Sequence, residues 1–291
     1  MAFFSYLISG LGLGSVYAII ALGYSMVYGI AKMLNFAHGD IIMVGAYVAF
    51  YLLSSFNMPV IPAVLVSTVV CLVLGVVIER LAYKPLRQAS SLTVLITAIG
   101  VSYFLENGAL LLWGADTKIF PNALPQGSLE LGSLSISYLS LLTIGVNIVI
   151  MVCLTLFINK TKTGRAMRAC SEDKGAATLM GINVNRIISI TFAIGSGLAA
   201  IAAILLCSAY PSVYPTLGSM PGIKAFTAAV FGGIGSIPGA FLGGLLLGVI
   251  EIFARAYIST QLSDAIVFAV LIVVLLIRPT GLLGKKTSEK V

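Results

Sequence analysis

Three polar side chains near the start of the chain could bind a polar solute or carry a proton. Asn35, His38 and Asp40 stand in the run Asn35-Phe36-Ala37-His38-Gly39-Asp40, and a long apolar stretch follows at once. Histidine titrates near neutral pH, and buried acidic or histidine groups relay protons in membrane carriers. His38 is the only histidine in the chain, however. A lone histidine is more typical of a hydrogen-bonded interfacial residue than of a ligand or a proton relay, so the sequence does not indicate proton transfer.

A second interruption of the apolar pattern lies at residues 232–239, Gly232-Gly233-Ile234-Gly235-Ser236-Ile237-Pro238-Gly239. Glycine and proline there leave backbone groups unpaired, and such groups are tolerated at membrane depth only inside protein or beside a wet cavity. Paired interruptions in the two halves of a chain point to a transport pathway. We assign a candidate pathway to Asn35, His38, Gly39, Asp40, Gly232, Gly233 and Gly235. Hydropathy does not distinguish such breaks from tight turns at the membrane surface, and both interpretations stay open.

Ionisable residues within apolar segments are costly in lipid and are therefore functional candidates. Glu106 is the clearest, and we add it to the candidate pathway. Glu251 and Arg255 are four residues apart, which places them on one helix face and predicts a structural ion pair. Glu79 and Asp264 stand near the ends of apolar segments, where we expect them to contact interfacial water.

Other chemistry finds no support in the sequence. There is no cluster of metal-ligating residues, no nucleophile motif and no convergent pair of carboxylates, so we assign no catalytic and no metal-binding residue. No GxxxxGK[ST] run is present either, so we expect no nucleotide site and no cofactor in this chain. These absences argue against an enzyme.

The elements that position these residues are apolar helices. Hydrophobic residues make up 59% of the chain and charged residues 9%, with a mean hydropathy of +1.08, whereas soluble domains carry about 25% charge. The apolar runs are continuous and lack the alternation of a β-barrel. The sequence therefore predicts an all-α polytopic membrane protein, a single domain over 1–291 with about 8–9 transmembrane helices and broken or re-entrant segments. We place them at 5–30, 40–55, 60–79, 92–113, 138–158, 187–208, 223–236, 239–255 and 262–277.

The seventh segment is too short to cross a bilayer comfortably, and we interpret it as half of a broken helix. Glycines four residues apart, as at Gly10 and Gly14 and at Gly244 and Gly248, let another helix approach closely. We expect these glycines to serve helix packing within or between subunits.

Basic residues predict the orientation, because cytoplasmic loops carry an excess of lysine and arginine. If 31–39, 80–91, 159–186 and 278–291 lie inside, they hold 14 of the 17 basic residues. We therefore expect an external amino terminus and an internal carboxy terminus. The net charge of +7 reflects this sorting. A nucleic-acid partner is not indicated, since the basic residues flank apolar segments rather than forming one face.

The one long polar stretch, 159–186, contains a segment that predicts a single short helix. Ser171 is a suitable N-cap, Glu172 and Asp173 follow in the first turn, and Gly181 is a suitable C-cap. A helix of about nine residues is marginal on its own in water, so a partner could hold it through Ala176, Ala177 and Met180. The same pattern is typical of a solvated connector on the bilayer surface, and both interpretations stay open.

Several segments together resemble the permease subunits of branched-chain amino acid ABC importers of the LivH type. The matching segments run in order along the chain: Gly14-Ser15-Val16-Tyr17-Ala18-Ile19-Ile20-Ala21-Leu22-Gly23, Asn35 to Asp40, Gly164-Arg165-Ala166-Met167-Arg168-Ala169, Gly181-Ile182-Asn183-Val184, Phe231 to Gly239, and Arg278-Pro279-Thr280-Gly281-Leu282-Leu283-Gly284. The Asn-Phe-Ala-His-Gly element is fairly specific, whereas related sugar permeases carry similar glycine-rich runs. The likeness covers almost the whole chain.

The resemblance implies an ABC importer permease fold in a bacterial inner membrane, with the amino terminus periplasmic and the carboxy terminus cytoplasmic. It implies a second permease subunit, two cytoplasmic ATPase subunits that bind ATP and Mg²⁺, and a periplasmic substrate-binding protein as partners. The loop 159–186 would then be the coupling loop, with ATPase contacts from Glu172, Asp173, Ala176, Ala177, Met180 and Gly181. Glu172 is displaced from the spacing of the family pattern.

The function implied is inward transport of branched-chain amino acids by alternating access, driven by ATP hydrolysis in the partner subunits. An importer of urea or short amides from the same family is an alternative, although an apolar passage suits leucine, isoleucine and valine better. A secondary carrier that acts alone is a second alternative, for which only Glu106 is a serious candidate as an intramembrane relay group.

Overall fold

A long central helix, α1 (Ala2–Ala31), organises the bundle. This computed structural model describes residues 2–122, 124–125, 127–131 and 134–284. In it, α1 packs against α10, α8, α5 and α9. Small residues allow the closest of these approaches: an added Cβ on Gly248 would lie 2.2 Å from the Cα of Gly14. The predicted glycine packing is thus confirmed within one subunit, where it joins α1 to α10.

Each of the nine predicted apolar segments is a helix. They are α1, α2 (His38–Ser54), α3 (Val60–Ile78), α4 (Ser91–Trp113), α5 (Tyr138–Lys160), α8 (Val184–Ala209), α9 (Ser219–Gly232), α10 (Ile237–Tyr257) and α11 (Ser263–Ile277). Six of these, with α3 extended to Leu86, are long and apolar enough to cross a membrane, whereas α2, α9 and α11 are shorter. The prediction that the seventh segment is short is confirmed, because α9 has 14 residues and covers about 21 Å.

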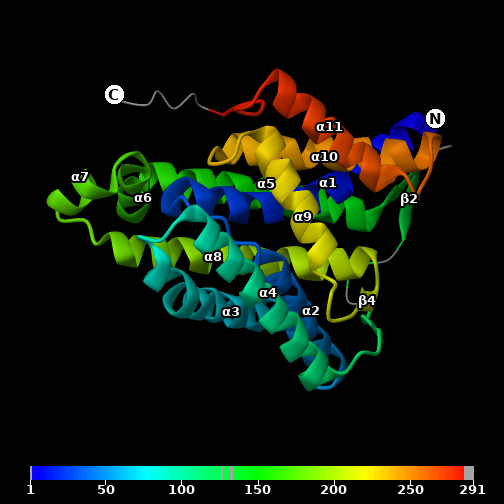
Figure 1. Ribbon diagram of the computed structural model, residues 1–291. Coiled ribbons are helices and arrows are strands. Elements are labelled where there is room, and N and C mark those ends of the chain that lie inside the picture. Colours follow the sequence, from blue (N-terminus) through cyan, green and yellow to red (C-terminus); the bar gives the residue numbers. More distant parts are fainter. Residues whose placement is uncertain (1, 123, 126, 132–133, 285–291) are drawn as a thin grey trace.

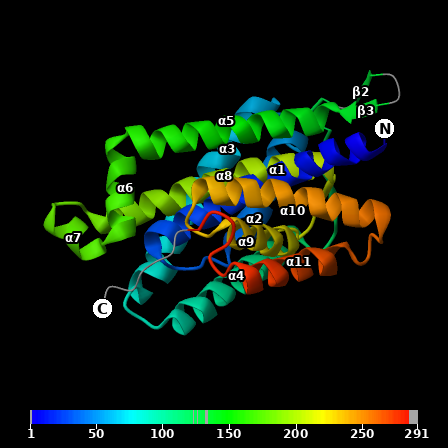
Figure 2. The same cartoon turned by 90° about the horizontal axis from the view of Figure 1, so that it is seen from above.

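The helices form an inner and an outer group. The apolar windows of α1 and α8 are 72% and 78% buried, whereas those of α3, α4 and α5 are 28%, 17% and 22% buried. Figure 2 shows α5 along one edge of the bundle and α4 and α11 along the opposite edge. The outer helices therefore present apolar faces that lipid or another membrane subunit can cover.

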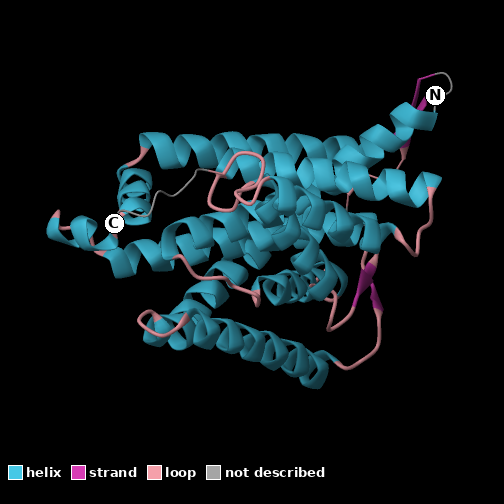
Figure 3. Cartoon of the chain, turned by 45° about the horizontal axis from the view of Figure 1, so that its top comes forward, coloured by secondary structure: helices cyan, strands magenta, loops and turns pink. Residues whose placement is uncertain are grey.

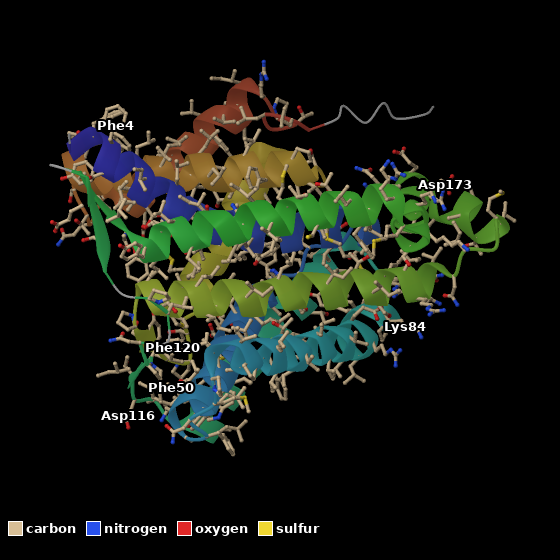
Figure 4. The ribbon with its side chains drawn as sticks, turned by 180° about the vertical axis from the view of Figure 1, so that it is seen from behind. Phe4, Phe50, Lys84, Asp116, Phe120 and Asp173 are labelled. Carbon is tan, nitrogen blue, oxygen red and sulfur yellow. The ribbon has the colours of Figure 1, made fainter. Side chains whose placement is uncertain are left out.

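Short elements gather at the two ends of the bundle (Figures 1 and 3). At the hairpin end, β2 (Ser128–Leu131) pairs antiparallel with β3 (Leu134–Ser137), and β1 (Lys118–Ile119) pairs with β4 (Ser212–Val213). At the loop end, α3 continues through a π-helical turn (Glu79–Tyr83) and a 3₁₀ turn (Lys84–Leu86). Figure 4 shows Lys84 and Asp173 at the loop end and Phe4 at the hairpin end.

The polar stretch 159–186 differs from its prediction. It forms two helices, α6 (Lys162–Glu172) and α7 (Lys174–Leu179), instead of one. Asp173 separates them in an extended conformation, and its carboxylate accepts a 3.0 Å hydrogen bond from the amide of Ala176. The N-cap of the short helix is therefore Asp173 and not Ser171, whose hydroxyl donates to the carbonyl of Arg168. The predicted end is confirmed, since Gly181 takes a positive φ of 78° directly after α7.

Candidate functional site

The first predicted interruption is a break inside the bundle. Lys32 takes a left-handed conformation after α1, and the chain turns back before α2 begins at His38. The His38 ring lies against Gly23, where an added Cβ would be 2.6 Å from Nε2. Gly23 is about 12 Å along α1 from the helix end at Ala31. The start of α2 therefore lies within the bundle, well away from the end of α1.

Glycines bring the start of α2 against the start of α9. An added Cβ on Gly39 would lie 2.5 Å from the carbonyl oxygen of Gly218, and one on Gly222 would lie 2.9 Å from the Cα of Gly39. Real Cβ contacts are essentially never shorter than 3.0 Å. Because the φ of Gly39 is not in the left-handed region, glycine is needed there for close packing and not for its backbone conformation.

Acidic and hydroxyl side chains from three helices meet beside this contact. The buried carboxyl of Asp40 on α2 interacts with the Ser102 side chain and with the charge of Glu106, both on α4. Glu106 in turn accepts a 2.5 Å hydrogen bond from the Ser219 hydroxyl at the start of α9. Of this cluster, the sequence predicted Asp40 and Glu106 but missed the two serines. Ser102 precedes Glu106 by four residues, a spacing that could have revealed it.

Several buried polar atoms in the break have no hydrogen-bond partner among the described residues. They are Asn35 Nδ2, His38 Nε2 and Asp40 Oδ2. The other end of the Asn35 amide is held, because Tyr83 donates a 2.8 Å hydrogen bond to its oxygen. Unpartnered buried polar groups are rare, since they carry a desolvation cost. Three such atoms therefore lie together in this one break.

The second predicted interruption is a turn held by other parts of the chain. Gly233 and Gly235 have φ values of 109° and 89°, and the Ser25 hydroxyl of α1 accepts a 2.9 Å hydrogen bond from the amide of Gly235. The carboxy-terminal segment pairs with it, since the amides of Leu282 and Leu283 donate to the carbonyls of Phe231 and Gly232. This interruption is a braced turn between α9 and α10, and Gly232 closes it against Gly239.

A buried network of charges joins α9, α10 and α11. Lys224 lies 2.7 Å from both Glu251 and Asp264, and Glu251 also pairs with Arg255. The predicted Glu251–Arg255 pair is confirmed, but Asp264 binds Lys224 instead of contacting only interfacial water. The sequence did not indicate a role for Lys224. Two cations and two anions balance here, as burial within a membrane protein requires.

Glu79 also differs from its prediction, because it is fully buried and pairs with Arg87. Its second carboxylate oxygen accepts a 2.6 Å hydrogen bond from the Ser189 hydroxyl of α8. The π-helical turn places Glu79 toward α8 while the chain leaves α3. Glu79 thus fastens the loop end of α3 to α8.

The loop end carries an exposed apolar surface on and after α7. Leu179 is 90% exposed and Met180 82%, and the predicted contact residues Glu172, Asp173, Ala176 and Gly181 are exposed as well. Ala177 is buried and faces the bundle. Sequence reasoning missed Leu179, which lies beyond the predicted alanine face.

Lys174 fastens this loop to α1. Its amine donates a 2.6 Å hydrogen bond to the carbonyl oxygen of Ala31, the last residue of α1. Burial, followed by the charges of Arg87 and Lys32, lowers the pKa of Lys174 below its usual range. Lys174 therefore links α7 to the end of the central helix.

A bundle of apolar helices with a polar break inside it and an exposed helical loop at one end defines a multi-pass membrane permease. The chain belongs to the branched-chain amino acid transport system / permease component family, whose model matches residues 6–275.

Relatives matched over nearly their whole length agree with this assignment, and a solved structure shares the fold. The chain is 48% identical to the high-affinity branched-chain amino acid transport system permease protein BraD of Pseudomonas aeruginosa, covering 98% of this chain and 97% of BraD. It is 45% identical to LivH of Escherichia coli K12, which has the same description, covering 99% and 98%. A solved structure of PsaBC from Streptococcus pneumoniae in complex with Fab shares the fold, with a TM-score of 0.50, 15% identity and coverage of 94% and 92%.

Proposed function

We propose that this chain is the membrane-spanning subunit of an ATP-driven importer, through which branched-chain amino acids enter the cell by alternating access. Its family membership and the names of its relatives support this substrate class. The structural observation that carries the proposal is the break at the start of α2. One side-chain polar atom each of Asn35, His38 and Asp40 lies buried there with no hydrogen-bond partner in the described part of the chain.

Asp40 and Glu106 supply the charge that such a substrate needs. An amino acid crosses as a zwitterion, so its ammonium group must exchange water for fixed acceptors on the way. The two carboxyls come from α2 and α4 and are close enough for their charges to interact, and the apolar helices around them suit a branched aliphatic side chain. A ligand can shift the equilibrium between two conformations only by binding one of them more tightly than the other. In this proposal the Gly39–Gly218 contact is where α2 and α9 move relative to each other.

The exposed surface on and after α7 is where the ATPase subunit that hydrolyses ATP contacts this chain. Leu179 and Met180 are exposed apolar side chains on a loop, where they can be covered by a groove on a cytoplasmic ATPase subunit. Glu172, Asp173, Ala176 and Gly181 border that contact, and ATP and Mg²⁺ are bound by the ATPase and not by this chain. Ala177 positions α7 from the inside.

The remaining partners and the orientation follow from the same proposal. The loop end is cytoplasmic, because Lys and Arg residues gather there, and the amino terminus and the β2–β3 hairpin are periplasmic. A second permease subunit and a periplasmic substrate-binding protein complete the importer in the bacterial inner membrane.

Uptake of labelled leucine and labelled urea in a deletion strain tests the proposal. Leucine uptake should be lost on deletion and restored by the wild-type gene. Glu106→Gln, expressed at normal level, should lower leucine uptake by at least tenfold, since it removes one of two carboxyls facing the ammonium group. Glu130→Gln, at an exposed position of β2, is the matched control. Unchanged leucine uptake with loss of urea uptake would overturn the substrate, and transport by the chain alone in liposomes without ATP would overturn the class.

A further inference from the structure

A cavity at the loop end lies between the end of α3 and the start of α8. Its volume is about 620 Å³, within the range of small-molecule binding sites. Arg80 and Lys84 border it from the α3 side, and Arg186 borders it from α8. None of the residues assigned above to the candidate pathway or to the α7 surface lines this cavity.

The three cations are free of counter-ions within the described part of the chain. All of them are exposed, and none lies within 4.0 Å of a described carboxylate oxygen. The nearest acidic residue in sequence, Glu79, is already neutralised by Arg87. The cavity therefore carries three positive charges that an anionic ligand could balance.

The polar walls of the cavity are fixed by hydrogen bonds. The Ser189 hydroxyl donates to Glu79, and the Asn185 amide oxygen accepts from Arg87. At the N-terminus of α8, the Asn183 side chain accepts from the amide of Arg186. These bonds hold the wall of the cavity and the backbone of Arg186 in place.

The remaining wall is apolar and runs along the bundle. Val76 of α3 and Ile190 and Ala193 of α8 line it, all of them on the membrane side of the cations. Figure 4 shows Lys84 at the end of the cyan segment that contains α3, opposite the start of α8. A cationic rim beside an apolar wall at the end of membrane helices matches the two chemical parts of an anionic phospholipid.

We propose that this cavity binds a phosphate group, presented by an anionic phospholipid whose acyl chains lie along Val76, Ile190 and Ala193. Arg80, Lys84 and Arg186 bind the phosphate oxygens, as basic pockets between membrane helices do for lipid headgroups. The leaflet is the cytoplasmic one if the orientation under Proposed function holds, but binding itself does not depend on that orientation or on the transported substrate.

The test measures lipid retained by the full-length chain, purified in the assembly in which it is extracted and placed in nanodiscs of phosphatidylglycerol or phosphatidylcholine. Native mass spectrometry should show phosphatidylglycerol retained in preference to phosphatidylcholine. The variant Arg80→Gln/Lys84→Gln/Arg186→Gln should lose this preference, by about fivefold for each cation removed. The control Lys160→Gln/Lys162→Gln/Arg165→Gln removes the same charge from the same end, outside the cavity, and should keep it.

Further arms separate the sources of phosphate and guard against misfolding. Inorganic phosphate is added at millimolar concentration, and the retained phosphatidylglycerol is measured again. If phosphate displaces phosphatidylglycerol, the site binds free phosphate and the lipid proposal is wrong. If phosphatidylglycerol stays bound, the result supports the lipid. Lipid retention is also measured for each single variant. If the triple variant does not fold, the three single variants still test the proposal. Equal loss in the cavity and control triples overturns the proposal. Loss of a protein partner with lipid retention unchanged also overturns it.

Discussion

The amine of Lys174 lies 2.6 Å from the carbonyl oxygen of Ala31, so the exposed helix α7 is tied to the end of the central helix. A helix carbonyl at this position has no partner within its own helix, and Lys174 supplies one. Because α1 contacts most of the inner helices, this bond is a short route from the loop surface to the interior of the bundle.

Replacing Lys174 with methionine should weaken coupling while leaving the loop folded. A hydrogen bond from a charged donor contributes about 1.5–3 kcal/mol, and methionine keeps the length of the side chain. We expect transport per ATP hydrolysed to fall several-fold in reconstituted vesicles. Lys162→Met, on exposed α6, is the control. Identical coupling ratios in the two variants would show that the bond to Ala31 has no part in coupling.

Leu179 and Ala177 should respond differently to aspartate, because one is 90% exposed and the other is buried. Leu179→Asp leaves the subunit folded but places a charge in the proposed ATPase contact, so co-purification of the ATPase should fall at least tenfold. Ala177→Asp buries an unpaired charge, and the amount of folded protein should fall instead. Pull-down and detergent-extracted yield measure the two effects. Full ATPase recovery with Leu179→Asp would remove α7 from the contact.

Gly39→Val should abolish uptake, since its Cβ would meet the carbonyl oxygen of Gly218 at 2.5 Å. α2 and α9 would have to separate, so Asp40 on α2 would move away from Ser219 on α9, which binds Glu106. Gly108→Val on α4 is the control, because nothing lies within 4 Å of an added Cβ there. Labelled leucine uptake, normalised to subunit level, gives the readout. Normal uptake by Gly39→Val would exclude this contact from the pathway.

The helices could be predicted because a bilayer imposes a single length and a single polarity on every spanning segment. All nine apolar segments became helices, and the short α9 was anticipated from its length alone. The hairpin β2–β3 was not, since a four-residue strand between polar turns carries little pattern. The π-helical turn at Glu79–Tyr83 was missed for another reason: it is set by the contacts of Glu79 and Tyr83 with distant residues.

The candidate site was only partly visible in the sequence. Asp40 and Glu106 were predicted because a carboxylate in an apolar run is unusual by itself. Ser219 and Lys224 were not, because their importance lies in partners that come from other helices. Both Ser171 and Asp173 are good N-caps, and the prediction chose Ser171, whereas in the structure Asp173 is extended and caps α7.

Lys224 and Asp264 share one 2.7 Å ion pair but should differ in what their removal costs. The Lys224 side chain is 6% exposed and also neutralises the fully buried Glu251, whereas the Asp264 side chain is 41% exposed. Lys224→Met leaves Arg255 as the remaining ion-pair partner of Glu251 in the described part of the chain and gives the network one excess negative charge, so it should cost more than Asp264→Asn, which should cost at most about 1 kcal/mol. The double variant restores neutrality, with Glu251 still paired to Arg255, and should be more stable than Lys224→Met alone. Thermal unfolding in detergent measures all three, and equal losses in the two single variants would show that Glu251 does not depend on Lys224.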